Sequence, residues 1–358
     1  RDACCRSSGA LQTVGTAEFL PASLAHEPFA SLPILPLLAM SETAPAPQWA
    51  DSSRGLGRWI ERLIGIRLLR RPLFFQARQL IIRTAERNGI PWRKRRSELW
   101  EAAAPLLAQS RSEGLVPPAY YQARFHAYEQ GNLCWQAAAE AEQATDAMAL
   151  RIWPEEKLAP LQAQTRLRNA IHALVEPLLS DSIHEVLDLG CSVGVSTQAL
   201  ARWLNDRADQ RGLKRPRLIG LDLSPEMLAV ARVRDGDSLI SEWCHAAAEQ
   251  TAWASETFDF ISLQFVCHEL PQNATREVCA EAARLLKPGG VLLMVDQDPA
   301  SSVLQRLPAA VATLLKSTEP YIEDYFGLDM SATLLQAGFR DLRITACDPR
   351  HRVIACLR

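Results

Sequence analysis

The stretch Val186-Leu187-Asp188-Leu189-Gly190-Cys191-Ser192-Val193-Gly194 decides the fold of this chain. Its apolar start predicts a buried strand, and the glycines that follow predict a tight turn that opens a helix. Glycine has no Cβ, so the backbone can approach a ligand closely at this turn, and the helix N-terminus adds unpaired N–H donors. We therefore expect a strand, a glycine turn and a helix, with a ligand at the turn.

A second strand is predicted at 217–222, and it ends in an acidic residue, Asp222. A carboxylate at the end of such a strand can accept hydrogen bonds from both ribose hydroxyls of an adenosine. Ser224 and Pro225 follow, a pair that suits the cap and the first turn of a helix. A glycine turn by itself indicates no more than a tight strand-to-helix connection, but this context favours a ligand that contains adenosine.

Short apolar runs alternate with helical patterns through the second half of the chain. Strands are predicted at 184–189, 217–222, 242–246, 258–265, 291–296, 342–347 and 353–357. Helices are predicted at 155–179, 197–210, 225–234, 274–286, 301–316 and 329–337. This alternation predicts an α/β fold with a doubly wound, seven-stranded, mostly parallel sheet whose last hairpin is antiparallel.

The first half reads as helical. Pro72 is expected to end a first helix, a second is expected from 73 to the Asn88-Gly89 stop, and Ser97 is expected to cap a third that runs to 108. Two more are predicted at 118–130 and 135–151. The domain prediction is a segment at 1–39 that is either a transit-like leader or non-native sequence upstream of a start at Met40, a helical region at 40–154 and a catalytic domain at 155–358.

The chain has 358 residues, of which 48% are hydrophobic and 22% charged, with a formal net charge of −2. This composition excludes wholesale disorder and a uniformly basic nucleic-acid binder. The balance hides a basic segment at 54–96, where thirteen Lys and Arg stand against two acidic residues. Three interpretations are open for this segment: a helical lid with solvated arginines, a surface that contacts an anionic membrane, or an attachment that guides RNA.

The nine cysteines show neither a C-x-x-C pair nor the Cys/His spacing of a zinc site, so the sequence predicts no metal centre. A reduced intracellular compartment fits this pattern better than an oxidising one. No run of about 18 apolar residues predicts a membrane span. We expect the cytoplasm of a bacterium or a plastid stroma, with peripheral membrane contact through 54–96, and not secretion.

Four stretches together resemble the motifs of class I S-adenosylmethionine-dependent methyltransferases. They are D-L-G-C-S-V-G (188–194), L-D-L-S-P-E-M-L (221–228), F-D-F-I-S-L-Q-F (258–265) and L-L-K-P-G-G-V-L (285–292). The resemblance covers roughly 155–358 and implies S-adenosylmethionine as cofactor. Ser192 stands where an NAD fingerprint usually has a further glycine, which weighs against NAD.

Three further stretches are similar to stand-alone small-molecule methyltransferases of photosynthetic lineages, in the type 11/12 group. They are F-H-A-Y-E-Q-G-N-L-C-W (125–135), H-E-L-P (268–271) and K-S-T-E-P (316–320). This similarity names no substrate.

The family resemblance also implies roles for single residues. Gly190 and Gly194 would flank the methionine part of the cofactor, Asp188 would orient its amino group, and Asp222 would hold the ribose. Ala247 stands where the family often has an acid near the adenine, so no acidic contact is expected there. The remaining predicted cofactor-binding residues are Cys191, Ser192, Leu223 and Gln264.

The methyl acceptor is expected beyond the end of the strand at 258–265, since ligands bind at the carboxyl ends of parallel strands. His268 and Glu269 lie there, and they would act as a general base with an orienting carboxylate. A histidine that only packs, with catalysis by positioning, is the other interpretation. Asp296 and Asp298 are placed beside the same site, although Asp298-Pro299 also suits a turn. The segment 316–321 is expected to be an ordered loop, and His351 a loop or surface residue.

These features predict a methyltransferase that acts on a small, apolar or lipidic molecule, such as a quinone or another isoprenoid or aromatic precursor. The alternatives are an RNA methyltransferase that uses the basic helices, and a catalytically silent methyltransferase-like assembly factor. DNA is not expected as a partner, because the N-P-P-Y and Pro-Cys patterns of DNA-modifying relatives are missing. The sequence fixes no oligomeric state.

Overall fold

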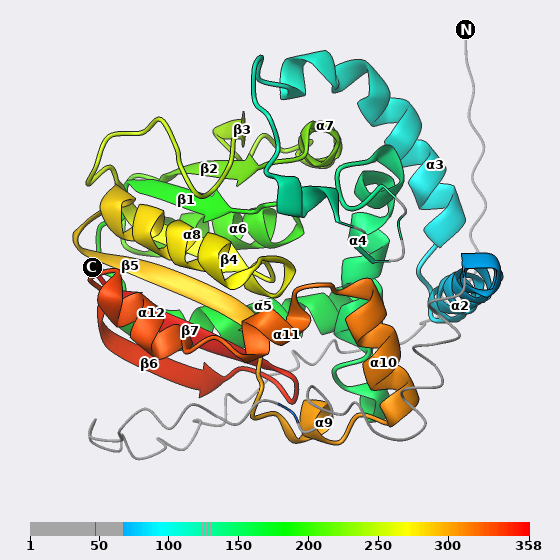
Figure 1. Ribbon diagram of the computed structural model, residues 1–358. Coiled ribbons are helices and arrows are strands. Elements are labelled where there is room, and N and C mark those ends of the chain that lie inside the picture. Colours follow the sequence, from blue (N-terminus) through cyan, green and yellow to red (C-terminus); the bar gives the residue numbers. More distant parts are fainter. Residues whose placement is uncertain (1–46, 48–66, 124, 127, 129) are drawn as a thin grey trace, which may run out of the picture. The chain divides into compact units, whose positions relative to one another are not determined.

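The computed structural model describes residue 47 and residues 67–358, with 124, 127 and 129 left out (Figure 1). All the described residues belong to one compact unit, Thr43–Arg358. The predicted leader at 1–39 lies outside the described residues, as does the first part of the basic segment, 54–66. The domain boundaries therefore stay predictions.

A seven-stranded sheet forms the centre of the described unit. Its strands are β1(Glu185–Leu189), β2(Arg217–Asp222), β3(Glu242–His245), β4(Phe258–Gln264), β5(Leu286–Gln297), β6(Arg340–Ala346) and β7(His351–Leu357). Their order is β3-β2-β1-β4-β5-β7-β6, in which β1 to β5 are parallel and β7 is antiparallel to both neighbours. The predicted fold class is confirmed, and β2 has the predicted bounds.

Helices cover both faces of the sheet (Figure 1). They are α2(Arg67–Arg87), α3(Trp92–Ala103), α4(Trp135–Leu150), α5(Pro160–Val175), α6(Val195–Gln210), α7(Pro225–Arg234), α8(Gln272–Leu285), α9(Ser302–Gln305), α10(Ala309–Thr318), α11(Ile322–Phe326) and α12(Met330–Gln336). Side chains alternate along a strand, so each strand supplies both layers. Leu187 of β1 belongs to the core under α8 and α12, whereas Val186 belongs to the core under α5 and α6.

Two expectations about the first helices are wrong. Pro72 does not end a helix, because α2 begins at Arg67 and passes through it. A proline inside a helix removes one hydrogen bond and need not stop the helix. Ser97 does not cap α3, which already begins at Trp92; its hydroxyl donates to the Arg93 carbonyl one turn earlier, at 3.3 Å.

Two other helix predictions also differ from the structure. The segment 118–130 forms only a short 3₁₀ turn, Ala119–Gln122, and His126 N–H then donates to the carbonyl of Thr318 at 2.8 Å. This contact over a long sequence distance replaces a helical hydrogen bond. The predicted helix at 301–316 is split into α9 and α10 around Pro308, which lacks an N–H donor.

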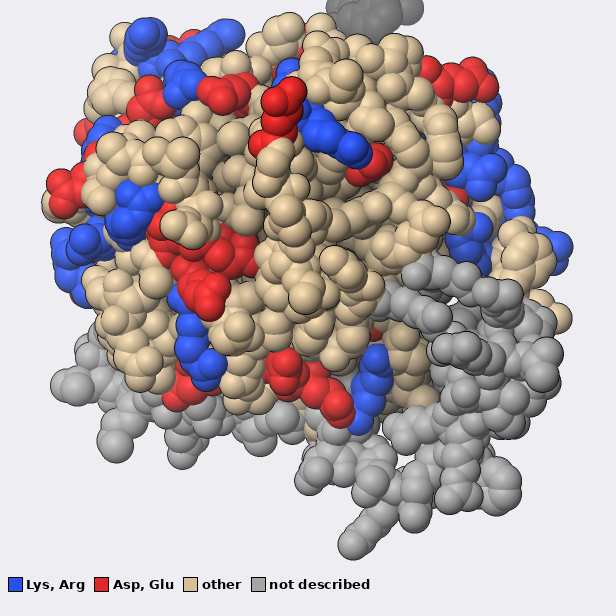
Figure 2. Space-filling view, turned by 45° about the horizontal axis from the view of Figure 1, so that its top comes forward, with Lys and Arg blue, Asp and Glu red and all other residues tan. Residues whose placement is uncertain are grey.

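The described part of the basic segment is largely paired with acidic residues. Arg78 and Arg96 pair with Glu140 of α4, and Arg95 pairs with Glu142 of the same helix at 2.7 Å. On the face shown in Figure 2, Lys and Arg lie interspersed with Asp and Glu. Part of the positive charge therefore holds α2 and α3 to α4.

The helices α3 and α4 pack on α7 of the sheet layer. Leu99 of α3 and Ala138 of α4 share one core cluster with Met227 and Val230 of α7. Within the part of the chain that the structure describes, no helix has the length and apolarity needed to span a bilayer. The segment between α3 and α4 lies next to the end of β3, where the backbone N–H of Ser112 donates to Nδ1 of His245 at 2.9 Å.

Candidate active site

The glycine turn after β1 depends on two backbone positions. Gly190 and Gly194 have φ values of +70° and +75°, which favour glycine. A Cβ on Gly190 would lie 2.6 Å from Cγ2 of Val266, and one on Gly194 would lie 2.5 Å from the ring of Trp243. Only glycine fits both positions without a shift of these neighbours.

Asp222 connects this turn to the end of β2. Its Oδ2 accepts from the backbone N–H of Ser192 at 2.7 Å, and its Oδ1 accepts from that of Ser224 at 2.8 Å. Burial disfavours its charged form and raises the pKa of Asp222 to about 6, although these N–H donors act in the opposite direction. Each oxygen keeps a second lone pair, which leaves the carboxylate able to accept from a ribose.

Asp188 lies at the other side of the turn. It is buried, and one of its oxygens accepts from the hydroxyl of Thr197 in α6 at 2.6 Å. Burial raises the pKa of Asp188 to about 6, with the hydrogen bonds from Thr197 and Ser262 opposing the rise. The carboxylate thus fixes the first turn of α6 against β1.

The side chain of Gln264, at the end of β4, is hydrogen-bonded to two other side chains of the protein. Its Oε1 accepts from Arg168 of α5 at 2.9 Å, and its Nε2 donates to the hydroxyl of Ser262 at 2.9 Å. Arg168 was not singled out in the sequence. It is buried, and burial lowers its pKa to about 10, although Asp188 favours its charge. No local sequence pattern marks an arginine that will be buried behind the glycine turn, so the sequence alone could not predict this role of Arg168.

The other predicted cofactor-binding residues lie around the same turn. Cys191 donates its N–H to the carbonyl of Leu221 at 2.9 Å, and burial raises the pKa of its thiol well above the usual value. Leu223 is buried, and its carbonyl lies 3.0 Å from Nε2 of His245. Ala247 is half-buried in the loop after β3.

The cofactor fits this arrangement. Gly194 is the N-cap of α6 and supplies no side-chain cap, so the first N–H groups of that helix have no side-chain acceptor at the cap. Such donors suit a carboxylate, and Asp222 suits ribose hydroxyls. Gly190, Ser192 and Gly194 would therefore hold the methionine part, and Asp222 the ribose.

His268, just after β4, and Asp296, in the last residues of β5, form a buried pair. Nδ1 of His268 lies 2.7 Å from Oδ1 of Asp296, and its backbone N–H donates to Oδ2 at 3.1 Å. Burial lowers the pKa of His268, but the facing carboxylate outweighs this and raises it to about 9. The carboxylate that orients His268 is thus Asp296, and the expectation that Glu269 does so is wrong.

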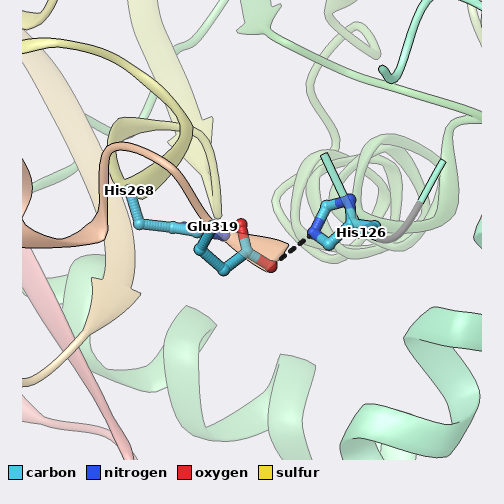
Figure 3. Close-up of side chains that lie close together, drawn as sticks. All are labelled: His126, His268 and Glu319. Atoms are coloured by element: carbon cyan, nitrogen blue, oxygen red, sulfur yellow. Dashed lines mark ion pairs between the residues drawn. The ribbon is translucent and has the colours of Figure 1, made fainter. Parts of the chain in front are cut away.

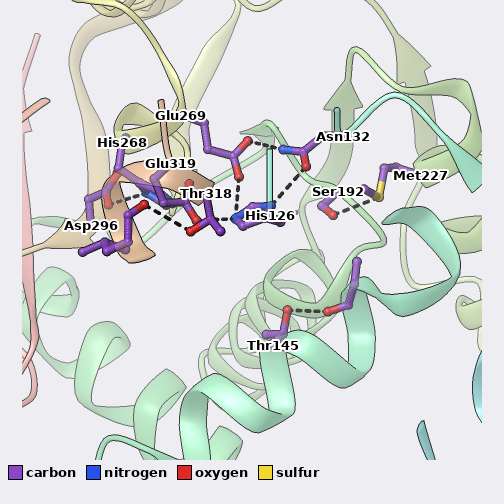
Figure 4. Close-up of polar contacts among 12 residues, drawn as sticks. His126, Asn132, Thr145, Ser192, Met227, His268, Glu269, Asp296, Thr318 and Glu319 are labelled. Carbon is purple, nitrogen blue, oxygen red and sulfur yellow. Dashed lines mark hydrogen bonds and ion pairs between the residues drawn. The ribbon is translucent and has the colours of Figure 1, made fainter. Parts of the chain in front are cut away.

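Glu269 is the last residue of the short turn Cys267–Glu269, and its carboxylate contacts Asn132 and His126. It accepts from the amide of Asn132 at 2.8 Å, and its carboxylate lies 3.7 Å from Nε2 of His126 (Figure 4). Burial raises the pKa of Glu269, while His126 and His268 lower it.

His126 closes the polar network. Its Nε2 lies 2.8 Å from a carboxylate oxygen of Glu319, and its Nδ1 lies 3.1 Å from Oδ1 of Asn132. Burial lowers its pKa, but Glu319 and Glu269 raise it to about 10. None of His126, Asn132 and Glu319 was predicted as a site residue, although two of the quoted stretches contain them.

An aromatic cluster and Tyr121 connect this network to the cofactor turn. Burial raises the pKa of the Tyr121 phenol well above its usual value, and the carboxylates of Glu269 and Asp222 raise it further. Its ring lies 5.5 Å from that of Tyr120, and Tyr120 packs edge-on against Tyr321 at 6.3 Å. The acceptor side of the site is therefore both aromatic and polar.

Two further expectations are settled by the geometry. Asp298 forms the expected turn, since its Oδ1 accepts from the N–H of Ala300 at 3.0 Å. His351 is not a surface residue: it is buried, its Nδ1 lies 2.8 Å from Asp348, and its ring packs edge-on against Phe265. It supports the hairpin and takes no part in the network around His268.

Comparison with known proteins assigns residues 187–294 to a family described as a methyltransferase domain. An uncharacterized methyltransferase of Synechocystis is 29% identical over 159 residues, which cover 44% of this chain and 68% of that protein. A 2-phytyl-1,4-naphtoquinone methyltransferase of Thermosynechococcus vestitus is 30% identical over 162 residues, 42% of this chain and 66% of that protein.

A demethylmenaquinone methyltransferase of Bacillus licheniformis is 32% identical over 110 residues, which cover 31% of this chain and 43% of that protein. The chain thus spans less than half the length of the Bacillus relative. Among solved structures, a methyltransferase from Aquifex aeolicus is 18% identical, with 55% of this chain and 92% of that chain covered and a TM-score of 0.41.

A mostly parallel seven-stranded sheet with an antiparallel last hairpin, a glycine turn after β1 and an acid after β2 define the class I, Rossmann-like methyltransferases. The matched domain and the relatives agree with this class. The chain is a class I S-adenosylmethionine-dependent methyltransferase, and S-adenosylmethionine is its cofactor.

Proposed function

We propose that this methyltransferase acts on a small, apolar or lipidic acceptor with an acidic oxygen, such as a quinol or another isoprenoid or aromatic precursor. The observation that carries the proposal is the His268–Asp296 pair together with the aromatic rings near it: His126 lies close to His268, and the ring of Phe125 lies 6.2 Å from that of His126 and 5.9 Å from that of Tyr321. Aromatic side chains suit a planar apolar acceptor, and a fixed imidazole suits its oxygen.

The quinone methyltransferases among the relatives support this class of acceptor. Their names describe those proteins, and identities near 30% leave the acceptor of this chain as a proposal. An RNA acceptor receives less support, because much of the described basic segment is paired internally with α4.

The cofactor, when bound, supplies an electrophilic methyl group on a sulfonium. Methyl transfer breaks the sulfur–carbon bond and forms a bond from that carbon to the acceptor, which loses one proton; the cofactor leaves as S-adenosylhomocysteine. Asp296 fixes the ring of His268, so that Nε2 is the atom left to face the acceptor oxygen. Holding the acceptor, methyl carbon and sulfur in line would supply most of the rate enhancement.

The experiment that tests the proposal compares metabolites of cells with and without the gene. We expect an apolar species about 14 Da lighter, one CH₂ unit, to accumulate when the gene is absent. Purified full-length chain with labelled S-adenosylmethionine should then transfer label into the organic extract of those cells. Label found only in ribosomal or transfer RNA would overturn the proposal in favour of an RNA methyltransferase.

A further inference from the structure

Three side chains from distant parts of the chain converge beside the acceptor side of the site. His126 follows the 3₁₀ turn Ala119–Gln122, His268 follows β4, and Glu319 directly follows α10. One potential ligand atom of each lies within 4.8 Å of those of the other two (Figure 3). Two imidazoles and one carboxylate are a ligand set that binds divalent transition metals in proteins.

Both histidines are oriented as metal-binding histidines are. Nδ1 of His268 is engaged by Asp296 at 2.7 Å, and Nδ1 of His126 is engaged by the amide oxygen of Asn132 at 3.1 Å (Figure 4). A hydrogen bond on one ring nitrogen fixes the ring and leaves the other nitrogen as the ligand atom. Nε2 of each ring is therefore the atom available to the cluster.

One carboxylate oxygen of Glu319 lacks a hydrogen-bond partner among the described residues. The residue is 6% exposed, and the oxygen without a partner is Oε2. Its Oε1 contacts Nε2 of His126 at 2.8 Å. A buried carboxylate oxygen without a partner is costly, and a bound cation would satisfy it.

The surroundings also favour a cation. The carboxylates of Glu269 and Asp296 lie beside the two histidines, so the cluster brings together more acidic groups than histidines. The side chain of His126 is 40% exposed, which gives an ion a path from solvent. Oriented ligands, an unsatisfied carboxylate and an open side are the features expected of a metal site.

We propose that His126, His268 and Glu319 bind a divalent transition-metal ion such as Zn²⁺ and leave a coordination position open for the acceptor oxygen. The acceptor part of this inference rests on the proposed function. Ligand atoms around Zn²⁺ stand about 2.0–2.2 Å from the metal, so the contact between His126 and Glu319 must open slightly on binding. Two imidazole ligands favour Zn²⁺, Mn²⁺ or Fe²⁺ over Mg²⁺ and Ca²⁺.

The ion would change the part that His268 plays. A metal on Nε2 removes that nitrogen from direct contact with the acceptor, and the cation instead contacts the acceptor oxygen. As a Lewis acid it lowers the pKa of that hydroxyl, whose proton leaves to solvent before the methyl group arrives. The oxidation state of the metal does not change, and no further reactant is needed.

The test uses the full-length chain after treatment with a chelator. Samples are dialysed against Zn²⁺ or Co²⁺, bound metal is measured by elemental analysis, and Co²⁺ coordination is followed by visible absorption. We compare the unmodified chain with Glu319→Gln and His126→Gln. The matched control is His184→Gln, because His184 is an exposed histidine far along the chain from the cluster.

We expect one ion per chain in the unmodified protein and in the control, and at least ~10-fold weaker binding in both cluster variants. Calorimetry with S-adenosylhomocysteine shows that the variants are folded, since none of the changed residues touches the glycine turn. Binding of S-adenosylhomocysteine without any retained metal in the unmodified chain, or equal metal retention in all four proteins, overturns the site.

The acceptor role is tested separately from the site. Label transfer into the organic extract should fall at least ~10-fold after chelation and return on addition of Zn²⁺ or Mn²⁺. Undiminished transfer by the chelated chain overturns the acceptor role. Metal binding together with an RNA-only methylation pattern would leave the metal site standing and reject the proposed acceptor class.

Discussion

Asp222 accepts a hydrogen bond from the backbone N–H of Ser192 at 2.7 Å, although thirty residues separate them in the sequence. Ser192 has a φ of +48°, an unusual value for a residue other than glycine. The carboxylate therefore stabilises the turn that would hold the methionine part of the cofactor, while it also faces the place of the ribose. Loss of the Asp222 side chain would therefore weaken the binding of both the methionine part and the ribose of the cofactor.

Replacing Asp222 by Asn tests this double role. The amide keeps the size of the carboxylate and loses its charge and part of its accepting capacity, so we expect S-adenosylmethionine to bind about 10- to 100-fold more weakly. Titration calorimetry measures the change. Asp237→Asn is the control, because Asp237 is exposed and lies away from the turn. Equal affinity of the two variants would contradict the assignment.

Cofactor binding should depend on pH through Asp222. The folded state raises the pKa of Asp222 from 3.8 to about 6. The carboxylate is therefore fully charged well above pH 6 and becomes protonated as the pH falls through 6. The charged form accepts from ribose hydroxyls, and affinity should therefore decrease towards pH 5, by at most ~10-fold per pH unit for one group. Calorimetry between pH 5 and 8 checks this, and Asp222→Asn should show a flatter profile.

Replacing Gly194 by Ala should destabilise the protein. The position has positive φ, and the new Cβ would meet the rigid ring of Trp243 at 2.5 Å. We expect a loss of about 2–4 kcal/mol of unfolding free energy, measured by urea denaturation. Gly236→Ala provides the comparison, since no atom lies within 4 Å of its Cβ position and its φ is not positive. A similar effect of both changes would refute the steric argument.

Removal of the Asp296 charge should separate acceptor chemistry from cofactor binding. In Asp296→Asn the ring of His268 faces a neutral amide with only one accepting oxygen, so we expect label transfer into the organic extract to fall about 10- to 100-fold. The affinity for S-adenosylhomocysteine should stay within about twofold. Glu323→Gln, on the exposed side of α11, is the control. Equal activity of the two variants would show that His268 only packs.

The membrane contact predicted for the segment 54–96 would involve exposed apolar side chains of α2. Phe75 and Leu80 are 62% and 63% exposed, in a helix that also carries several arginines. Association with anionic liposomes should decrease at least ~5-fold in the double variant Phe75→Glu, Leu80→Glu, as measured by sedimentation. Leu161→Glu changes a similarly exposed residue of α5 and should leave association unchanged. Equal loss in both variants would remove α2 from the contact.

The sheet was predictable because its signals are local. The run at 217–222 is apolar, ends in an acid and is followed by a capping serine, and β2 has those bounds. The helix predicted at 118–130 was wrong for the opposite reason. The composition of this segment suits a helix, but the backbone N–H of His126 donates to the distant carbonyl of Thr318 and not to a carbonyl one helical turn earlier. Local propensity yields to such tertiary contacts.

The acceptor side of the site could be predicted only in part. His268 follows β4 and Asp296 lies near the end of the neighbouring strand β5, so their proximity can be inferred once the strand order is known. His126 and Glu319 lie on irregular connections nearly two hundred residues apart, and no spacing rule brings them together. The two histidines and the glutamate form a cluster only in the folded chain.

The position of β7 has a consequence for how the protein is made. β7 lies between β5 and β6, so the longest strand of the sheet gains its second neighbour only from residues 351–357. During synthesis, one edge of β5 stays unpaired until residues 351–357 have left the ribosome. An exposed strand edge invites pairing with other chains. A translation product that stops between β6 and β7 would therefore be prone to aggregate although every residue of the cofactor turn is present.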